Sequence, residues 1–188
     1  MEKVIYLKGY AEKEGFTESL AFRSVARAIY DSVTNDINVA QGDIINCKFN
    51  DIDMCDVSFA DEFIINFQKM LLEVENTLLR LMNVNEHVRE NIEGALMLRN
   101  KKDHSKICLL TYEDGAYSII GDIEKNLNET FSLIVFKPQI TARDVAQRFN
   151  IEINSASNRL KKLYNLRLLQ RQESIDESGR QHIYYLPK

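Results

Sequence analysis

The sequence predicts a two-domain protein of the α/β (α+β) class, and three observations support that prediction. Short β-rich runs alternate with helical periodicities up to about residue 103, which is typical of a sheet covered by helices. Pro138 interrupts the apolar run before it and marks the end of a helix. The charge also changes, because residues 1 to 139 carry 15 Lys or Arg against 23 Asp or Glu, whereas residues 140 to 188 carry nine against five.

The composition is that of a globular protein, with 45% hydrophobic and 28% charged residues. No apolar run approaches the ~20 residues of a membrane-spanning helix. The first residues lack the apolar core of a signal peptide, so we expect a cytoplasmic protein that does not bind membranes. The cysteines and histidines are scattered, at Cys47, Cys55, Cys108, His87, His104 and His182. This scatter predicts no disulfide framework, no metal site and no cofactor.

In the first 103 residues, alternating apolar patterns predict three strands and three helices. The expected strands cover residues 4–8, 43–49 and 76–82, and the expected helices cover residues 17–33, 59–74 and 85–98. In the first helix Thr17 fits an N-cap, and the predicted core face holds Leu20, Val25, Ile29 and Val33. In the third helix Val88, Ile92 and Leu96 are spaced four apart. This alternation indicates a sheet that is at least partly parallel, with helices packed against it.

Residues 104–121 are expected to form a β-hairpin that connects the two domains. Two β-rich runs flank the pair Asp114-Gly115, which is a strong signal for a tight hairpin turn. A helix is then expected over residues 122–136, before Pro138.

The last fifty residues predict two further helices followed by two strands. Thr141 and Asp144 form a capping-box pair at the start of a short helix. Asn150 suits the left-handed residue that ends this helix. The core side of that helix is expected to hold Val145, Ala146 and Phe149. Over residues 154–165 a second helix is predicted, with Ile153, Ala156, Leu160 and Leu163 in one narrow sector. Two strand-like runs then flank the segment "IDESGR".

The strings "ITARDVAQRFNI" and "SASNRLKKL", followed by the two strand-like runs, resemble the winged-helix form of helix-turn-helix DNA-binding domains. With the helix at 122–136 as the first of three, the likeness covers residues 122–188. It implies that the helix at 154–165 lies in the major groove of double-stranded DNA, with Asn154, Ser155 and Asn158 nearest the base edges. The resemblance implies phosphate contacts from Arg159, Lys161, Lys162, Arg171 and Arg180. Thr141 and Ser157 complete the expected DNA-binding set. The alternatives are that these positions are only solvated, or that they dock on a protein.

The stretch "DMCDVSFADEF" joins a strand to a helix, and helix capping explains most of it. Ser58 fits the N-cap and Asp61 the third helical position, while Asp61 and Glu62 place negative charge in the first turn. Phe59, Phe63 and Phe67 are spaced four apart and are expected to form a core stripe.

The strand "IINCKFNDID", the turn "MCDVSFADEF", and the strand "TLLRLM" between two helices resemble the STAS fold of anti-sigma-factor antagonists. A STAS-like bacterial family with a Ser-Phe-Ala-Asp-Glu turn is more similar still. The likeness covers about residues 15 to 102, within an expected domain of residues 1–103. It implies a docking surface at Asp56, Ser58, Asp61 and Glu62, a partner ATPase of the GHKL type, and phosphorylation of Ser58. Val57 and Phe59 depart from the antagonist motif, which has Ser and Gly there.

These observations favour a cytoplasmic transcriptional regulator that binds DNA through its C-terminal domain and is controlled by docking on its N-terminal domain. A protein-interaction module that does not bind DNA is the alternative. Neither a nucleophile with a base nor a Gly-rich phosphate loop is found, so we expect no enzymatic activity. Winged-helix proteins often dimerise on palindromic sites, so a homodimer is one possible state of this chain.

Overall fold

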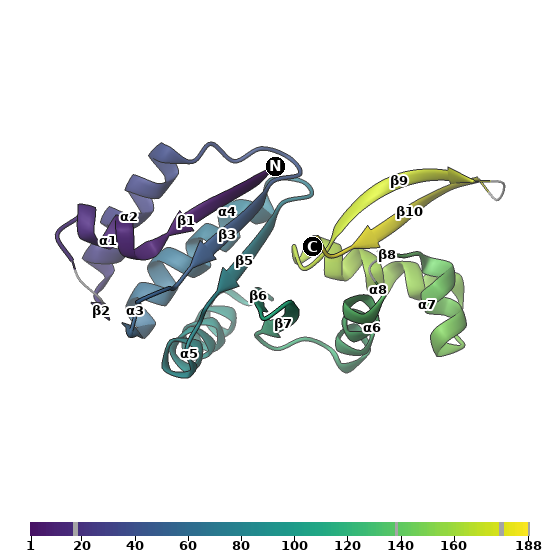
Figure 1. Cartoon of the computed structure of the whole chain (residues 1–188). Coiled ribbons are helices and arrows are strands. Elements are labelled where there is room, and N and C mark those ends of the chain that lie inside the picture. Colours follow the sequence, from purple (N-terminus) through teal and green to yellow (C-terminus); the bar gives the residue numbers. More distant parts are fainter. Residues whose placement is uncertain (17–18, 138, 177–178, 188) are drawn as a thin grey trace. The chain divides into compact units, whose positions relative to one another are not determined.

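The structure is a computed structural model with a mixed α/β fold, and it describes residues 1–16, 19–137, 139–176 and 179–187. Its contacts divide the chain into two compact units, Met1–Asp122 (unit 1) and Ile123–Lys188 (unit 2). Figure 1 labels the elements of both units, and each unit is described by itself. Unit 1 carries 13 Lys or Arg against 21 Asp or Glu, whereas unit 2 carries 11 against seven. The excess of negative charge therefore belongs to unit 1.

Unit 1 is built on a five-stranded sheet with the strand order β1-β3-β5-β6-β7. The strands are β1 (Glu2–Tyr6), β3 (Ile44–Lys48), β5 (Leu78–Met82), β6 (Leu109–Glu113) and β7 (Ala116–Ile120). The first four are parallel along this order, and β7 is antiparallel to β6. The strands expected at 43–49 and 76–82 are confirmed, as is a partly parallel sheet. The strand expected at 4–8 begins two residues earlier.

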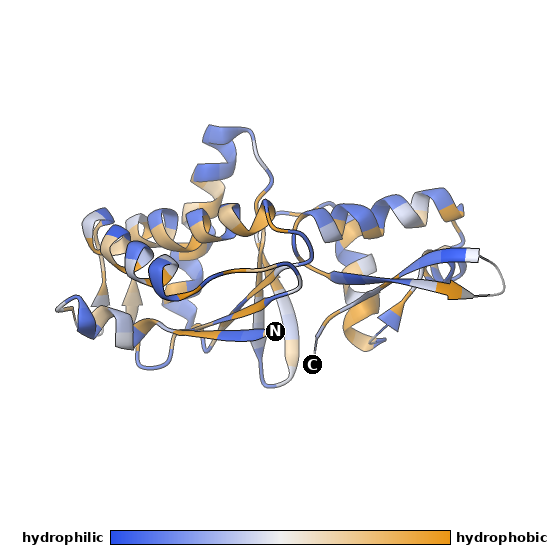
Figure 2. Cartoon of the chain, turned by 90° about the horizontal axis from the view of Figure 1, so that it is seen from above, coloured by the Kyte–Doolittle hydropathy of each residue, from blue (hydrophilic) through white to orange (hydrophobic). Residues whose placement is uncertain are grey.

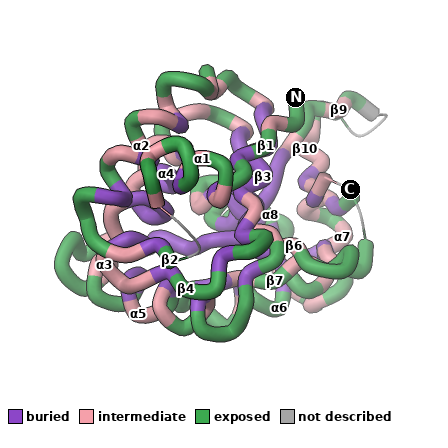
Figure 3. The backbone as a smooth tube through the Cα atoms, turned by 60° about the vertical axis from the view of Figure 1, so that its left-hand side comes forward, coloured by how far each residue is buried: buried purple, intermediate pink, exposed green. Residues whose placement is uncertain are grey.

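The helices of unit 1 pack on one face of this sheet (Figure 2). They are α1 (Leu7–Lys13), α2 (Arg23–Asp36), α3 (Val57–Phe59), the π-helical stretch η1 (Ala60–Ile65), α4 (Asn66–Leu72) and α5 (Glu86–Asp103). Alternate strand residues such as Ile45, Leu79 and Leu81 share one buried cluster with Val88 and Ile92 of α5. Figure 3 shows the buried backbone running through this layer between exposed helix surfaces.

Two elements near the N-terminus differ from the expectation. Helix α1 was not predicted; it buries Leu7 and Ala11, a spacing of four within a stretch too short to show a clear period. The helix expected at 17–33 begins only at Arg23, and Thr17 lies outside the described residues. Leu20 belongs instead to β2 (Ser19–Leu20), which pairs in parallel with β4 (Met54–Cys55). Tertiary pairing therefore overrides the helical period at Leu20.

The hairpin at 104–121 belongs to the sheet and is not a separate connector. Strand β6 pairs with β5, and β7 closes the edge. The turn residues Asp114 and Gly115 have φ values of 50° and 81°, as a tight two-residue hairpin turn requires. The expected hairpin is thus confirmed, but it extends unit 1 to Asp122.

The face of the sheet opposite the helices carries a buried arginine. Arg80 donates from Nε to Asn46 Oδ1 at 2.6 Å, from Nη1 to the Tyr117 hydroxyl at 3.0 Å, and from Nη2 to Glu2 Oε1 at 3.0 Å. Its guanidinium also lies 5.1 Å from the centre of the Tyr112 ring. Because these partners come from β1, β3, β6 and β7, Arg80 links the strands across the width of the sheet.

In its described residues, unit 2 contains three helices and a three-stranded antiparallel sheet with the order β8-β10-β9. Its elements are α6 (Lys125–Phe136), β8 (Gln139–Ile140), α7 (Ala142–Phe149), α8 (Ile153–Asn165), β9 (Gln170–Asp176) and β10 (Gly179–Tyr185). Helices α6 and α7 both pack on α8. The three helices and two long strands agree with the expectation, while the two-residue strand β8 was not predicted.

Both ends of α7 agree with the sequence prediction. Thr141 and Asp144 form the capping box, and Asn150 takes the left-handed conformation with φ 50°. Ala156, Leu160 and Leu163 of α8 are buried as expected, but Ile153 is exposed because it is the first residue of the helix and lies beyond the packed turn.

Replacing Arg80 by Met should lower the free energy of unfolding by about 1–3 kcal/mol, because Asn46 loses its hydrogen-bond partner inside the protein. Urea unfolding followed by circular dichroism measures this loss. Glu2→Gln is the matched control, since Glu2 is half-exposed and its ion pair is worth less than about 1 kcal/mol. Equal midpoints for Arg80→Met and Glu2→Gln would contradict a structural role for the buried guanidinium.

Candidate functional site

The turn between β4 and α3 is held by Asp56. Its Oδ1 accepts the Phe59 backbone N–H at 2.6 Å, and its Oδ2 accepts the Phe22 backbone N–H at 3.1 Å. Asp56 is therefore the N-cap, and the prediction that Ser58 caps this helix is wrong. Strand β4 ends at Cys55, so the extended residue that precedes the helix is Asp56. Ser58 lies inside α3 and is half-buried.

The predicted phenylalanine stripe is confirmed. Phe59, Phe63 and Phe67 are buried, with ring centroids 5.5 Å and 6.0 Å apart along the series. The helix passes through the π-helical stretch η1 between the first and last of these rings. Asn66 Nδ2 donates to the Glu62 carbonyl at 2.9 Å, which satisfies a backbone acceptor beside the wider turn.

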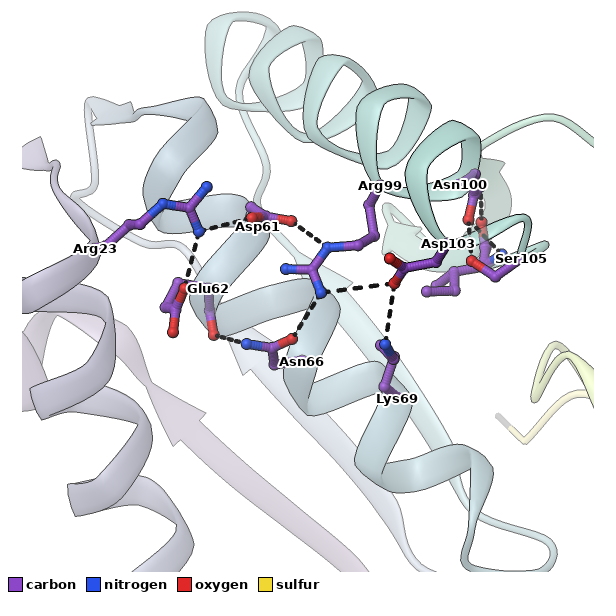
Figure 4. Close-up of polar contacts among 10 residues, drawn as sticks. Arg23, Asp61, Glu62, Asn66, Lys69, Arg99, Asn100, Asp103 and Ser105 are labelled. Carbon is purple, nitrogen blue, oxygen red and sulfur yellow. Dashed lines mark hydrogen bonds and ion pairs between the residues drawn. The ribbon is translucent and has the colours of Figure 1, made fainter.

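Three arginines surround the two acidic residues of the turn, and Figure 4 labels Arg23 and Arg99 among them. Asp61 accepts from Arg99 Nε at 2.7 Å and from Arg23 Nη1 at 2.8 Å. Glu62 accepts from Arg23 Nη1 at 2.9 Å and from Arg27 Nε at 2.8 Å. The arginines come from α2 and α5, so the network ties both helices to η1. Sequence reasoning missed all three arginines, because no local spacing connects residues about 35 positions apart.

The two carboxylates and Arg99 are mostly buried, whereas Arg23 and Arg27 are exposed. The side chains of Asp61 and Glu62 are 14% and 16% exposed, whereas those of Arg23 and Arg27 are 50% and 65% exposed. Burial raises the pKa of Asp61, but the hydrogen bonds from Arg99 and Arg23 outweigh it and the pKa is lowered overall. The Arg27 hydrogen bond lowers the pKa of Glu62 against a smaller effect of burial. Both carboxylates are thus ionised at neutral pH beneath a positive outer layer.

In unit 2, α8 presents a row of exposed polar side chains, which we call the polar ridge: Asn154, Ser157, Asn158 and Lys161. Helical geometry places these four on one face, opposite the buried Ala156, Leu160 and Leu163. Ser155 is exposed on the flank. Asn154 and Ser157 also line a groove of about 300 Å³ together with residues of α7 and β10. The polar ridge therefore borders a groove whose other wall is the β-hairpin.

The other predicted DNA contacts are engaged within unit 2. Their partners are Asp144 for the Thr141 hydroxyl, Glu124 for Lys162, Glu173 for Arg180, the Phe149 ring for Arg159 and the Tyr164 ring for Arg171. Thr141 also acts as the N-cap of α7, because its hydroxyl oxygen accepts the Asp144 backbone N–H at 3.3 Å. Lys162 and Arg180 keep exposed side chains, and the Arg180–Glu173 pair, at 2.9 Å, lies on the surface of the hairpin.

Two groove residues were missed by sequence reasoning. Arg143, in the first turn of α7, and His182 of β10 line the groove beside Asn154 and Arg180. Arg143 follows the Thr141 cap by two positions, is exposed, and lies opposite the buried Val145 in the helical period, so that period after the cap was the available signal. His182 lies two residues after the exposed Arg180 and so shares its face of β10, a period-2 signal in a strand that was predicted.

A scan against protein-family models finds no match for this chain, and searches of curated proteins and of solved structures find none either. Among the helices of the described ranges, none is long and apolar enough to cross a membrane. The same described residues hold no group of three or more His, Cys, Asp or Glu side chains suited to a metal ion. The site assignments therefore depend on geometry alone.

The new cap assignment leads to a direct comparison of two alanine variants. Asp56→Ala should lower the free energy of unfolding by about 0.5–2 kcal/mol, because two backbone N–H groups lose their acceptor. Ser58→Ala should change it much less, since Ser58 lies within the helix. Urea midpoints of the two variants measure the difference. If Ser58→Ala proved the more costly change, the assignment of Asp56 as the cap would be wrong.

The network also predicts a pH dependence. A carboxylate whose pKa is lowered by folding contributes stability that is complete above its unfolded pKa of about 4 and is lost as the pH falls through the folded value. The stability difference between the wild type and Asp61→Asn should therefore be largest near pH 7 and narrow below about pH 4. Urea midpoints across this range measure it. The exposed Asp53→Asn variant is the control, and a pH-independent difference for Asp61→Asn would contradict the argument.

Proposed function

We propose that the chain is a transcriptional regulator that binds double-stranded DNA through unit 2 and receives a partner on unit 1. In this proposal unit 2 acts as a winged helix and unit 1 as a STAS-like docking domain. The element order of unit 2, three helices with a short strand after the first and a long β-hairpin at the end, supports the first part.

The polar ridge of α8 is the observation that carries the proposal. A helix that reads DNA must keep its outer face free of apolar packing while its inner face anchors it to the domain. Helix α8 meets both conditions, because Ala156, Leu160 and Leu163 are buried beneath exposed Asn154, Asn158 and Lys161. An asparagine in this position can bond bidentately to adenine, and a lysine can neutralise a phosphate.

The groove beside the polar ridge supports separate roles for base contacts and phosphate contacts. Arg143 and Arg180 bring positive charge from α7 and β10 to the groove that Asn154 also lines. In our proposal these arginines hold the phosphate backbone while Asn154 and Asn158 face the bases. Thr141 caps α7, so its replacement is expected to lower stability in addition to weakening any contact that it makes with DNA.

Electrostatics favours unit 2 over unit 1 as the DNA-binding part. Unit 2 has four more basic than acidic residues, whereas unit 1 has eight more acidic than basic ones. A duplex carries one negative charge per ~1.7 Å of its axis, so an approach to the acidic unit is penalised. The proposed DNA contact is therefore confined to a surface that its net charge allows.

Docking of unit 2 on a protein is the second candidate, and the pairing of Lys162 and Arg180 with carboxylates favours it. Glu124 and Glu173 already neutralise these two basic side chains, which leaves fewer charges for phosphates. Unit 1 then serves as the partner of a GHKL-type ATPase, as the STAS resemblance implies. The two candidates differ in salt dependence, because DNA affinity falls steeply with salt in proportion to the phosphates contacted.

Selection from random DNA with the full chain tests the proposal, and we expect a short motif to be enriched. On that motif Asn158→Ala should lose about 1–3 kcal/mol of affinity and relax specificity at one base pair. Lys161→Ala should weaken binding to all sequences and reduce the slope of log affinity against log salt by about one. Fluorescence anisotropy at several salt concentrations measures both effects.

Lys125→Ala is the matched control, since Lys125 is an exposed lysine at the start of α6, outside the polar ridge. It should leave the salt slope unchanged. Absence of any enriched motif, or the same salt slope for Lys161→Ala and Lys125→Ala, would contradict DNA binding by unit 2. It would favour the second candidate, docking of unit 2 on a protein.

A further inference from the structure

We propose that one surface of unit 1 binds an acidic peptide segment that carries apolar side chains. This surface is formed by Phe22, Arg23, Val57, Leu98 and Lys102. We call it the Phe22 surface. The inference deepens the docking role proposed for unit 1, and it rests on that role. Three independent observations carry it: a strained exposed aromatic residue, a small hollow lined by the next residue in the chain, and the exposure of the surrounding basic side chains.

Phe22 holds a costly backbone conformation with its ring in solvent. It has φ 71° and ψ 143°, a region that suits glycine, and it is 70% exposed. Such a conformation costs about 1–3 kcal/mol in a residue with a side chain. Its N–H bonds to Asp56, and its carbonyl accepts from the Ala26 N–H at 3.2 Å, so the fold holds both backbone groups in place. Stability alone would favour Gly here, so a contact made by the ring is the physical reason to keep Phe.

A hollow lined by Arg23, the residue that follows Phe22, has the size of a receptacle for a side chain. Its volume is about 130 Å³, and it is lined by Arg23, Val57, Asp61, Ala95, Leu98, Arg99 and Lys102. Pockets for small molecules are typically about 300–1,000 Å³, so this hollow is too small for a cofactor. Leu98, 59% exposed, and Val57 supply apolar walls. One apolar side chain of a peptide can enter there while a second packs against the Phe22 ring.

The charges around the hollow select an acidic partner. Asp61 and Glu62 lie beneath the guanidiniums of Arg23 and Arg27, and Lys102 adds an exposed ammonium at the rim. A ligand that approaches from solvent therefore meets positive groups first. Unit 1 as a whole carries a net negative charge, which disfavours the same ligand elsewhere on its surface. DNA fits poorly, because Phe22 and Leu98 place apolar side chains where a phosphate backbone would lie.

Panning a display library of random peptides on the immobilised full chain tests the proposal. We expect enriched peptides to be net acidic and to carry large apolar residues. For a synthetic copy of an enriched peptide, Phe22→Gly should weaken binding by about tenfold or more, as loss of a central aromatic anchor does. The same variant should unfold at an equal or higher temperature, because glycine relieves the strained φ. Lys102→Glu should also weaken binding.

Met97→Ser is the matched control, because Met97 is an exposed apolar residue of α5 that does not line the hollow. It should leave affinity unchanged, while Leu98→Ser should reduce it and serves as a second variant independent of the backbone at residue 22. Enrichment of basic or uncharged peptides, no enrichment, or equal affinity for wild type and Phe22→Gly would each overturn the proposal. The DNA selection uses the same chain but tests binding by unit 2, whereas the peptide panning tests binding by the Phe22 surface. A negative result in one experiment is therefore distinct from a negative result in the other.

Discussion

Asp61 and its two arginines form the interaction on which the arrangement of unit 1 depends. A carboxylate that is mostly removed from water is tolerated only with charged hydrogen-bond donors at close range. Arg99 and Arg23 provide them at 2.7 Å and 2.8 Å, and they come from α5 and α2, on opposite sides of η1. The requirement of one carboxylate therefore fixes two helices against a third, and it leaves guanidinium groups on the outside. The Phe22 surface owes its charge to this arrangement.

Short polar side chains at helix starts also position helices, through hydrogen bonds to the backbone. Asp56, Asn85 and Thr141 each accept a backbone N–H in the first turn of the helix that follows, in both units. Two of them also bond across the fold, since Asp56 holds Phe22, and Asn85 donates to the Ile52 carbonyl at 3.1 Å. A cap that bonds to a second segment positions a whole helix and not only its first turn. For this reason the cap at Asp56 matters more for the site than Ser58, although both residue types cap helices well.

The sequence sufficed where a pattern is local, and it failed where partners are distant. The capping box at Thr141, the phenylalanine stripe and the Asp114-Gly115 turn depend on spacings of at most four residues, and all are present. The helix expected from residue 17 failed because Leu20 pairs with Cys55, a contact that no periodicity records. The arginines around Asp61 were missed for the same reason. Of the predicted DNA contacts, the exposed positions on α8 follow from the helical period, whereas the partners of Lys162 and Arg180 required coordinates.

Control of DNA binding by a docked partner requires a physical link between two surfaces. The partner inferred for unit 1 is acidic, and DNA is acidic too, so repulsion between them is one such link. Repulsion through water decays over about 8 Å at physiological salt, so it acts only where the bound peptide comes that close to the duplex. A link made by steric exclusion or by a change of conformation does not weaken as salt rises. Because raised salt also weakens DNA binding itself, the informative quantity is the ratio of DNA affinities with and without the peptide at each salt concentration. A ratio that tends to one as salt rises indicates charge repulsion, and a constant ratio indicates exclusion or a conformational change.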